Sequence, residues 1–215
     1  MAHLVSRLKS VSSIDAIVLA TTVNAADDVL VDFARKEGIL VFRGSELDVM
    51  GRVVGAAQLA QADVIVEITG DCPIIDPEIV EQTIQMYLSN DVAYVSNGHI
   101  RSYPDGMDVQ VFSREVLERS AAMTDAPLDR EHVSLHIRNH PELFSKLTLV
   151  APTSLRWPEL GLTLDEPADY TLLTKIIEAL SPENALFRCG DVLALLRGHP
   201  EWVGINSAVV RKGDA

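Results

Sequence analysis

Residues 62–76 read Ala-Asp-Val-Ile-Val-Glu-Ile-Thr-Gly-Asp-Cys-Pro-Ile-Ile-Asp, and this stretch decides the predicted fold. Its part 64–68 is a short β-branched run with a single charge, which is typical of a buried strand. Thr69 and Gly70 break the run, and Asp71 follows just past the predicted strand end. Because ligands bind at the carboxyl ends of strands in open parallel sheets, Asp71 is a candidate ligand for a metal and a phosphate. The alternative is that its carboxylate only caps a turn.

A second stretch repeats this order of residues. Residues 162–169 read Leu-Thr-Leu-Asp-Glu-Pro-Ala-Asp, so an acid, Asp165, again follows a short apolar strand and precedes a proline that starts a helix. Asp165 is also a plausible helix N-cap, which alone explains its presence. Two acids at strand ends of one sheet predict a Mg²⁺ site that bridges substrate phosphates. Their separation in sequence leaves open whether they meet in space.

Strand and helix signals alternate along the chain, which predicts helices packed around a mainly parallel sheet in a single domain, 1–215. We expect strands at 16–20, 39–42, 64–68, 91–96, 107–112 (exposed-edge or antiparallel), 144–150 and 162–164, with a strand-like end at 203–210. We expect helices at 2–9, 24–37, 49–60, 77–88, 114–123, 129–139, 168–180 and 189–197. Local signals fix several helix ends: Asp48, Asp76 and Ser113 as N-caps and Gly38 as a C-cap.

Composition narrows the class of protein. The chain has 215 residues, 47% of them hydrophobic, so it can bury a sizeable core. A net charge of −13 argues against a nucleic-acid-binding face. The two cysteines, Cys72 and Cys189, form no disulfide scaffold. No apolar run is long enough to span a membrane and no signal peptide opens the sequence, so we expect a cytoplasmic protein.

Two other patterns indicate different chemistry. His132, His136 and His140 are spaced four apart and would share one face of a continuous helix, as a zinc site requires. However, Pro141 follows His140 and no glutamate completes a metalloprotease pattern. Cys72 is a candidate nucleophile, but no base is adjacent in sequence, and a buried small side chain is the alternative.

Five motifs in order carry a resemblance to a known family. They are Phe-Arg-Gly-Ser-Glu-Leu-Asp-Val-Met-Gly-Arg (42–52), Thr-Gly-Asp-Cys-Pro-Ile-Ile-Asp (69–76), Tyr-Pro-Asp-Gly-Met-Asp-Val-Gln-Val-Phe (103–112), Asp-Arg-Glu-His-Val (129–133), and Leu-Arg-Trp (155–157) with Leu-Asp-Glu-Pro-Ala-Asp (164–169). The chain resembles cytidylyltransferases of the spore-coat polysaccharide F type, which are related to acylneuraminate and ketodeoxyoctonate cytidylyltransferases. This resemblance implies a nucleotide-diphospho-sugar transferase-like fold.

The resemblance also implies a reaction, in which CTP and a sugar acid give a CMP-sugar and pyrophosphate with Mg²⁺ as cofactor. By resemblance, Asp71 and Asp165 would hold the metal and act in catalysis. Arg43 and Arg52 would lie on the nucleotide side, although a solvated helix face is the alternative for Arg52. The residues implied for the sugar are Tyr103, Asp108, Gln110, Arg130 and His132.

The sequence departs from the family at two places. Family members begin with a strand and a loop rich in Arg, Gly, Ser and Lys that wraps the triphosphate, and we expect this first strand and loop to be missing here. Glu67 stands where many relatives have a basic residue, unless strand alternation turns it away from the site. A non-catalytic nucleotide-sugar-binding or scaffold relative and a histidine-dependent metal hydrolase therefore stay as alternative hypotheses. The apolar tail 202–211 would complete the sheet or form a homodimer contact.

Overall fold

The computed structural model describes residues 1–210 and shows a mixed α/β protein with two sheets. The first sheet pairs β1 (Val18–Thr22) in parallel with β2 (Leu40–Gly44). The second has the order β3-β5-β4-β6, with bounds Val64–Glu67, Gln110–Ser113, Tyr94–Ser96 and Lys146–Thr148. In it β4 and β6 are parallel, whereas β5 runs antiparallel between β3 and β4. The predicted α/β class is confirmed, and so is the antiparallel placement of the strand near 107–112.

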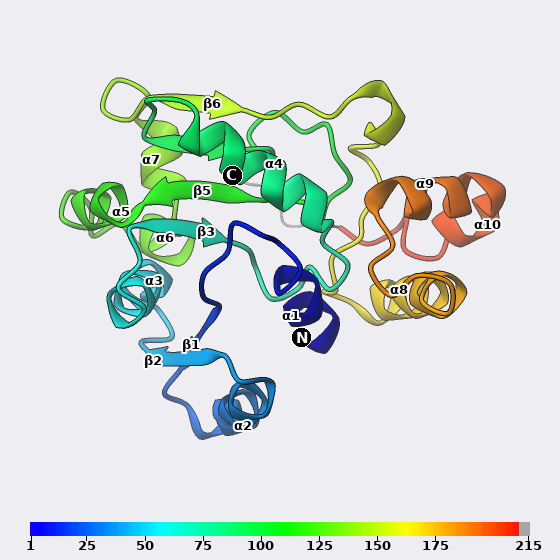
Figure 1. Ribbon diagram of the computed structural model, residues 1–215, viewed down its shortest axis with the longest axis horizontal. Helices are drawn as coiled ribbons and strands as arrows, with labels where there is room; N and C mark the ends of the chain where they lie inside the picture. Colours follow the sequence, from blue (N-terminus) through cyan, green and yellow to red (C-terminus); the bar gives the residue numbers. More distant parts are fainter. Residues whose placement is uncertain (211–215) are drawn as a thin grey trace.

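Helices cover both faces of the four-stranded sheet (Figure 1). Because side chains alternate along β5, Val111 packs in one cluster with Ile79 and Ile84, whereas Phe112 packs in another with Leu117 and Ile137. The helices are α1 (Ala2–Leu8), α2 (Asp28–Glu37), α3 (Val49–Leu59), α4 (Pro77–Leu88), α5 (Arg114–Ala121), α6 (Pro127–Glu131), α7 (Leu135–Asn139), α8 (Pro167–Leu180), α9 (Cys189–Gly198) and α10 (Pro200–Val203), with short 3₁₀ turns at Ala25–Asp27 and Thr153–Leu155.

The local signals for helix ends are confirmed. The Asp48 carboxylate accepts a hydrogen bond from the Gly51 amide at 2.8 Å and caps α3, and the Ser113 hydroxyl caps α5 by accepting from the Val116 amide at 3.1 Å. Gly38 ends α2 with a positive φ of 67°, a conformation that suits glycine. These ends follow from residues within one turn, which is why sequence alone locates them.

Three predicted elements are wrong. The helix expected at 129–139 is broken into α6 and α7 at His132, which has φ −105° and ψ 69°. In one straight helix Leu135 would face away from Val133 and Ile137, and the break allows all three side chains to be buried. Residues 162–164 form no strand, since Leu162 and Leu164 donate backbone hydrogen bonds to two different loops. Residues 203–210 form no strand either, since Val203 ends α10 and turns follow it.

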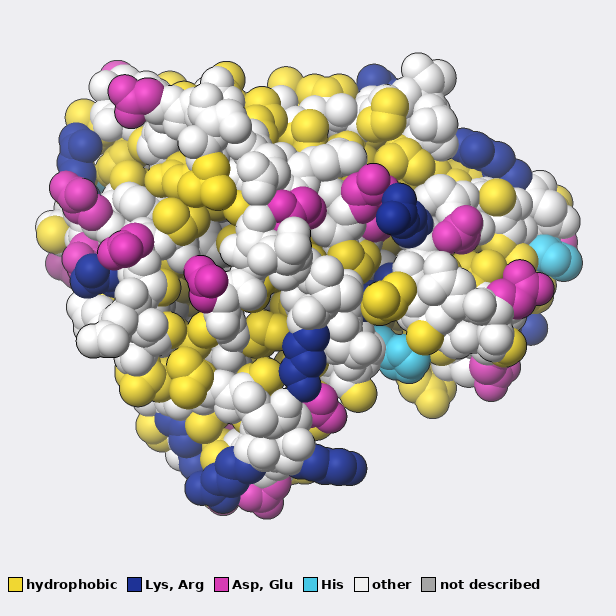
Figure 2. Space-filling model, in the orientation of Figure 1, with side chains coloured by type: hydrophobic (Ala, Val, Ile, Leu, Met, Phe, Trp, Pro, Cys, Tyr) yellow, Lys and Arg dark blue, Asp and Glu magenta, His cyan; other side chains and the backbone are white. Residues whose placement is uncertain are grey.

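The single domain is predicted to span residues 1–215. Residues 211–215, including Arg211 of the predicted apolar tail, lie outside the described part of the chain. Within residues 1–210 no helix is both long and apolar enough to cross a membrane. Acidic and basic side chains are scattered over the face of the molecule that Figure 2 shows. This face is hollowed between the lobe around α2 and the lobe formed by α8, α9 and α10.

Candidate active site

The structure brings the two predicted carboxylate turns together. The Leu164 amide donates a 2.8 Å hydrogen bond to the backbone carbonyl of Asp71, so the segment before Asp165 lies directly against the Asp71 turn. On its other side the same segment is anchored by the Leu162 amide, which donates to the Asp105 carbonyl at 2.8 Å. Residues almost a hundred positions apart in sequence therefore meet at one edge of the fold.

A threonine orients each of the two carboxylates. The Thr69 hydroxyl donates a hydrogen bond to Asp71 Oδ1, and the Thr163 hydroxyl donates to Asp165 Oδ2 at 2.7 Å. Asp71 is half-buried, whereas Asp165 is exposed. Each hydroxyl fixes one carboxylate oxygen and so orients the other. Sequence reasoning missed both threonines, although the repeated Thr-x-Asp spacing was a signal that could have found them.

Asp165 is not the N-cap of α8, which corrects the alternative given for it from sequence. Glu166 occupies the cap position, and the buried carboxylate of Asp169 accepts hydrogen bonds from the backbone amides of Asp165 and Glu166 at 3.2 and 3.0 Å. The two backbone amides just before α8 are thus satisfied by a carboxylate in the first turn of the helix. The Asp165 carboxylate therefore does not have to cap α8.

A third acid lies beside the Asp71 turn. Burial chiefly raises the pKa of Glu67 to about 7, the negative charges of Asp71 and Asp108 raise it further, and the positive charge of Arg138 lowers it. Glu67 accepts a hydrogen bond from the side-chain amide of Gln110, and it shares a strand face with Ile65 of the cluster around Phe112. The carboxylates of Glu67, Asp71 and Asp108 therefore lie within electrostatic range of one another.

Gln110 sits in a polar network at the start of β5. Its Oε1 accepts hydrogen bonds from the Tyr94 hydroxyl at 2.7 Å and from the Ser134 hydroxyl, while its Nε2 donates to Glu67. These partners come from β4, β3 and the segment before α7. Gln110 is thus held rigidly at the edge where Asp108 also lies, as the implied sugar side requires.

The two arginines implied for the nucleotide hold loops that follow β1 and β2. Arg43 donates to the carbonyls of Thr22 and Asn24, both at 2.8 Å, and pairs with Asp28 at 2.7 Å. Arg52 donates to the carbonyls of Ser45 and Glu46 at 2.6 and 3.1 Å, so it is not simply a solvated helix side chain. Both guanidinium groups therefore order the carboxyl end of the β1–β2 sheet.

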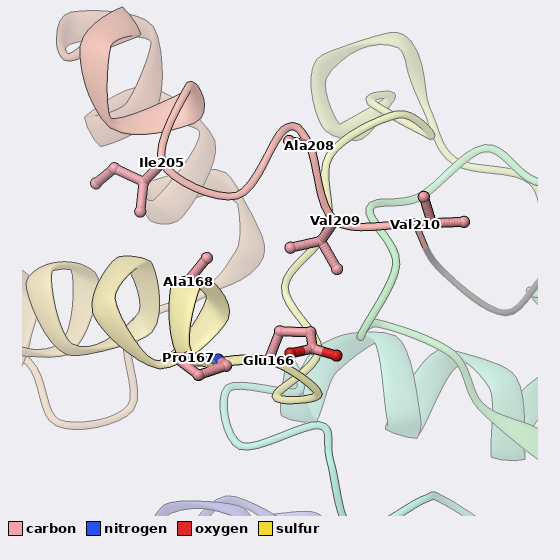
Figure 3. A pocket seen from close by; sticks show the side chains of 7 residues that line it. All are labelled: Glu166, Pro167, Ala168, Ile205, Ala208, Val209 and Val210. Carbon is pink, nitrogen blue, oxygen red and sulfur yellow. The ribbon is translucent and has the colours of Figure 1, made fainter.

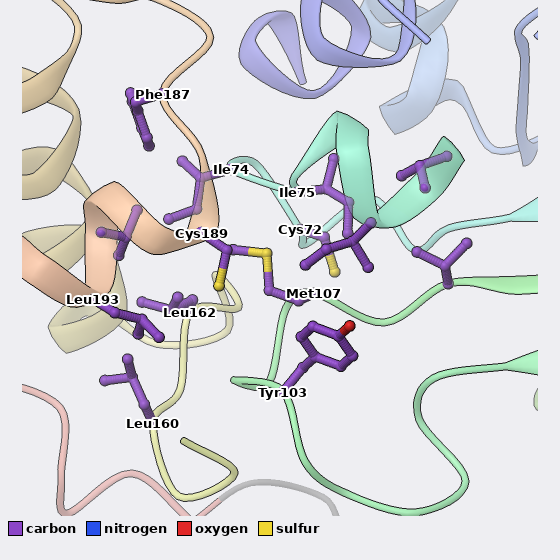
Figure 4. Packing of buried hydrophobic residues seen from close by; sticks show 14 of the residues in the cluster. Cys72, Ile74, Ile75, Tyr103, Met107, Leu160, Leu162, Phe187, Cys189 and Leu193 are labelled. Carbon is purple, nitrogen blue, oxygen red and sulfur yellow. The ribbon is translucent and has the colours of Figure 1, made fainter. Parts of the chain in front are cut away.

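Three residues implied for the sugar have other surroundings. Tyr103 is only 4% exposed and packs in the core with Met107 and Cys189 (Figure 4), and burial chiefly raises the pKa of its hydroxyl. Arg130 pairs with Asp48 at 3.6 Å and Asp125 at 3.1 Å, beside α3 and α5. His132 is exposed at the end of α6. The side-chain ion pairs of Arg130 are thus with the start of α3 and with the segment that follows α5.

The two alternative chemistries lose their geometric support. Because the helix breaks at His132, the three histidines do not form a stripe on one helix. His136 approaches Asp129 at 3.4 Å, and His140 contacts the backbone carbonyl of His136 at 2.8 Å. Cys72 is buried, and desolvation holds the pKa of its thiol well above the usual range, which disfavours the nucleophilic thiolate.

The carboxylate turns fit a hard divalent cation. Within residues 1–210 no group of three or more His, Cys, Asp or Glu side chains is arranged to enclose a metal. Mg²⁺ nevertheless keeps several waters and is commonly held by one or two carboxylates together with substrate phosphates. Two adjoining turns, each presenting one oriented carboxylate, match that requirement better than they match a site formed by protein ligands alone.

Comparison with known proteins supports this assignment of the fold. The spore coat polysaccharide biosynthesis protein SpsF of Bacillus subtilis (strain 168) is 33% identical over 192 residues, covering 87% of this chain and 77% of SpsF. A solved cytidylyltransferase from Leptospira borgpetersenii serovar Hardjo-bovis superposes with a TM-score of 0.89 at 27% identity, covering 98% of this chain and 87% of that one.

A more distant structure shares the fold alone. It is CMP:2-keto-3-deoxy-manno-octonic acid synthetase complexed with CTP, which matches with a TM-score of 0.53 at 16% identity and covers 85% of this chain and 87% of the synthetase. The sequence pattern described as Cytidylyltransferase matches residues 1–185. The resemblance read from the five motifs is thereby confirmed, and the chain belongs to the cytidylyltransferase family.

Proposed function

We propose that the chain transfers CMP from CTP to a sugar or sugar acid, releasing pyrophosphate, to make a precursor for surface polysaccharide in the cytoplasm. The observation that carries this proposal is the hydrogen bond from the Leu164 amide to the Asp71 carbonyl, which joins two Thr-x-Asp turns at one edge of the fold. SpsF is described as a spore coat polysaccharide biosynthesis protein, and the synthetase structure holds CTP, which supports this choice of reaction.

In this reaction a hydroxyl oxygen of the sugar loses its proton to solvent and bonds to the α-phosphorus of CTP, while the bond from that phosphorus to the pyrophosphate oxygen breaks. Bound Mg²⁺ would neutralise charge on the phosphates, and Asp71 and Asp165 would hold it. Thr69 and Thr163 fix the orientation of these two carboxylates. Gln110 and Asp108 would contact the sugar, and Arg43 and Arg52 would shape the nucleotide side.

A second candidate is a relative that binds nucleotide-sugars without catalysis. The crowding of Glu67, Asp71 and Asp108 favours it, because acidic side chains without a bound cation repel a triphosphate more strongly than a nucleotide-sugar, which carries fewer phosphate charges. The two candidates differ in metal dependence. Catalysis requires the Asp71 and Asp165 carboxylates to hold the metal, whereas binding of a nucleotide-sugar without catalysis does not.

Calorimetric titration with CTP and Mg²⁺ tests the proposal, with ATP, GTP and UTP as competing nucleotides. We expect selective CTP binding that Asp71→Asn and Asp165→Asn each weaken at least about tenfold, since each removes one charged ligand. The matched control is Asp91→Asn, an exposed aspartate before β4. Pyrophosphate release over a panel of sugar acids then identifies the acceptor. A folded wild-type chain that binds no CTP contradicts the proposal.

A further inference from the structure

A buried asparagine from the C-terminal segment lies behind the Asp165 turn. Asn206 is 5% exposed and lies beyond residues 1–185, the part that matches the family pattern. Its neighbours Ile205, Ala208 and Val209 lie along the start of α8, where they line an open hollow of about 420 Å³ (Figure 3). The segment therefore packs against the helix that begins directly after Asp165.

The side-chain amide of Asn206 joins the two ends of the loop that carries Asp165. Its Nδ2 donates to Asp169 Oδ1 at 2.7 Å and to the Gly161 carbonyl at 3.0 Å. The amide nitrogen has two hydrogens, so it can serve both acceptors at once. Asparagine suits this position because an aspartate offers no donor and a serine offers only one.

Asp169 connects Asn206 to the backbone of the Asp165 turn. It is fully buried, and its Oδ2 accepts the backbone amides of Asp165 and Glu166. With Oδ1 held by Asn206, the Asp169 carboxylate cannot rotate without breaking several hydrogen bonds. The backbone at Asp165 is thus fixed from behind, while the Leu164 amide fixes it from the side of Asp71.

We propose that Asn206 is a positioning residue that acts through Asp169 to hold the Asp165 carboxylate where a divalent cation on the bound nucleotide can reach it. This inference rests on the proposed function, since it assumes that Asp165 is a metal ligand. Partners behind a metal ligand commonly change metal affinity by about ten- to a hundredfold when they are removed. A purely structural anchor for the tail would leave metal affinity unchanged.

Two measurements on Asn206→Asp test the inference. Hydrogen exchange of the Asp165 and Glu166 amides reports the clamp itself, and electron paramagnetic resonance of Mn²⁺ in the presence of CTP reports metal affinity. We expect exchange at least about tenfold faster and Mn²⁺ binding about tenfold weaker, because a second carboxylate beside Asp169 is repelled. The control is Ser207→Ala, which removes an exposed hydroxyl bonded to the Gly204 carbonyl and leaves both quantities unchanged.

A double variant separates positioning from damage to the fold. When Asp169→Asn is combined with Asn206→Asp, the side-chain pair forms again with donor and acceptor exchanged, and the amide oxygen introduced at position 169 still accepts the two backbone amides. The bond to the Gly161 carbonyl is not restored, because an aspartate at position 206 offers no donor. We therefore expect a partial recovery of Mn²⁺–CTP affinity, from the loss of about tenfold in the single variant to within about threefold of wild type. Failure of the double variant to recover affinity overturns the inference even if the single variant unfolds.

The remaining outcomes distinguish the two proposals. If the wild-type chain binds Mn²⁺–CTP and the Asn206→Asp chain binds it equally well, this inference is overturned and the proposed function stays intact. Wild-type chain that binds no Mn²⁺–CTP overturns the proposed function and this inference together. In that case the exchange rates still show whether Asn206 holds the turn.

Discussion

The Asp71 turn and the Asp165 turn use the same residue types in a different order. Both have a threonine two residues before the acid and a helix that begins at a proline, α4 at Pro77 and α8 at Pro167. In the first turn a second acid, Asp76, is itself the N-cap of α4. In the second turn the acid that serves the helix, Asp169, lies inside the first turn of α8.

The difference shows that in each turn a second acid serves the backbone at the helix start, which leaves Asp71 and Asp165 available for the proposed cation. The buried acids, Asp76 and Asp169, satisfy backbone amides, and they are 3% and 0% exposed. The acids that a solvated cation can reach, Asp71 and Asp165, are half-buried and exposed. Because another carboxylate serves each helix, neither Asp71 nor Asp165 has to give its charge to a helix N-terminus.

Replacing Asp76 by alanine is expected to have the largest effect on stability. Its carboxylate caps α4 through the Glu78 amide at 2.8 Å and accepts the buried Cys189 amide at 2.7 Å, and its charge favours the charged form of buried Arg7. Losing the cap, leaving a buried amide unpaired and removing this charge should together cost about 3–5 kcal/mol. Urea denaturation measures this loss.

The matched variant Asp76→Asn keeps one acceptor oxygen and should lose less stability than Asp76→Ala. Equal losses in the two variants would show that the charge, rather than the hydrogen bonds, is what α4 and Cys189 require.

Replacing Asp169 by alanine should cost less, about 2–3 kcal/mol. The amides of Asp165 and Glu166 that lose their acceptor lie in an exposed turn, where water can take its place. The buried Asn206 amide keeps its bond to the Gly161 carbonyl. The same urea titration measures the difference, and a loss larger than that of Asp76→Ala would reverse the expected ranking of the two turns.

These turns also show how far sequence reasoning reaches. The caps at Asp48, Asp76 and Ser113 are predictable because the capping amide lies two or three residues from the side chain. The choice between Asp165 and Asp169 is only partly predictable in this way: the Glu166 amide lies three residues from Asp169, but the bond from Asn206, 37 residues away, has no local signal. The break at His132 likewise depends on burying side chains on opposite faces of one helix. Pairing of the two carboxylate turns was expected only as a possibility, since it rests on long-range backbone contacts.

The Asp71 turn has a third acid for which the other turn has no counterpart, since Glu67 lies four residues before Asp71 and Gly161 four before Asp165. The pKa of Glu67 is raised from 4.5 to about 7, so the folded chain keeps a proton that the unfolded chain has released. Stability should therefore fall as pH rises from about 4.5 to about 7 and then stay level.

Glu67→Gln should remove this part of the pH dependence. The neutral amide keeps an acceptor for Gln110, so the variant should gain about 1–2 kcal/mol over wild type at pH 8 and nothing near pH 4.5. This gain in stability is smaller than the free energy that corresponds to the full pKa shift, because Glu67 is only half-buried. Urea titrations at both pH values provide the test, and a difference between Glu67→Gln and wild type that does not change with pH would show that folding does not raise the pKa of Glu67.

The smallest effects on stability are expected from the two threonines, and these compare the turns most directly. Thr69→Val and Thr163→Val each keep the side-chain shape and remove the hydroxyl that donates to Asp71 or Asp165. Each should cost at most about 1 kcal/mol of unfolding free energy, because both acids can be solvated instead. Metal affinity should change more, since a carboxylate that has lost the hydrogen bond from its threonine is less ordered and must be ordered when the cation binds. Mn²⁺ titration with CTP measures that change. We expect the larger loss for Thr163→Val, because Asp165 is exposed and water competes for its carboxylate oxygens, whereas half-buried Asp71 is also held by packing and by the nearby Cys72 thiol. A larger loss for Thr69→Val would indicate that Asp71 is the less rigid of the two ligands.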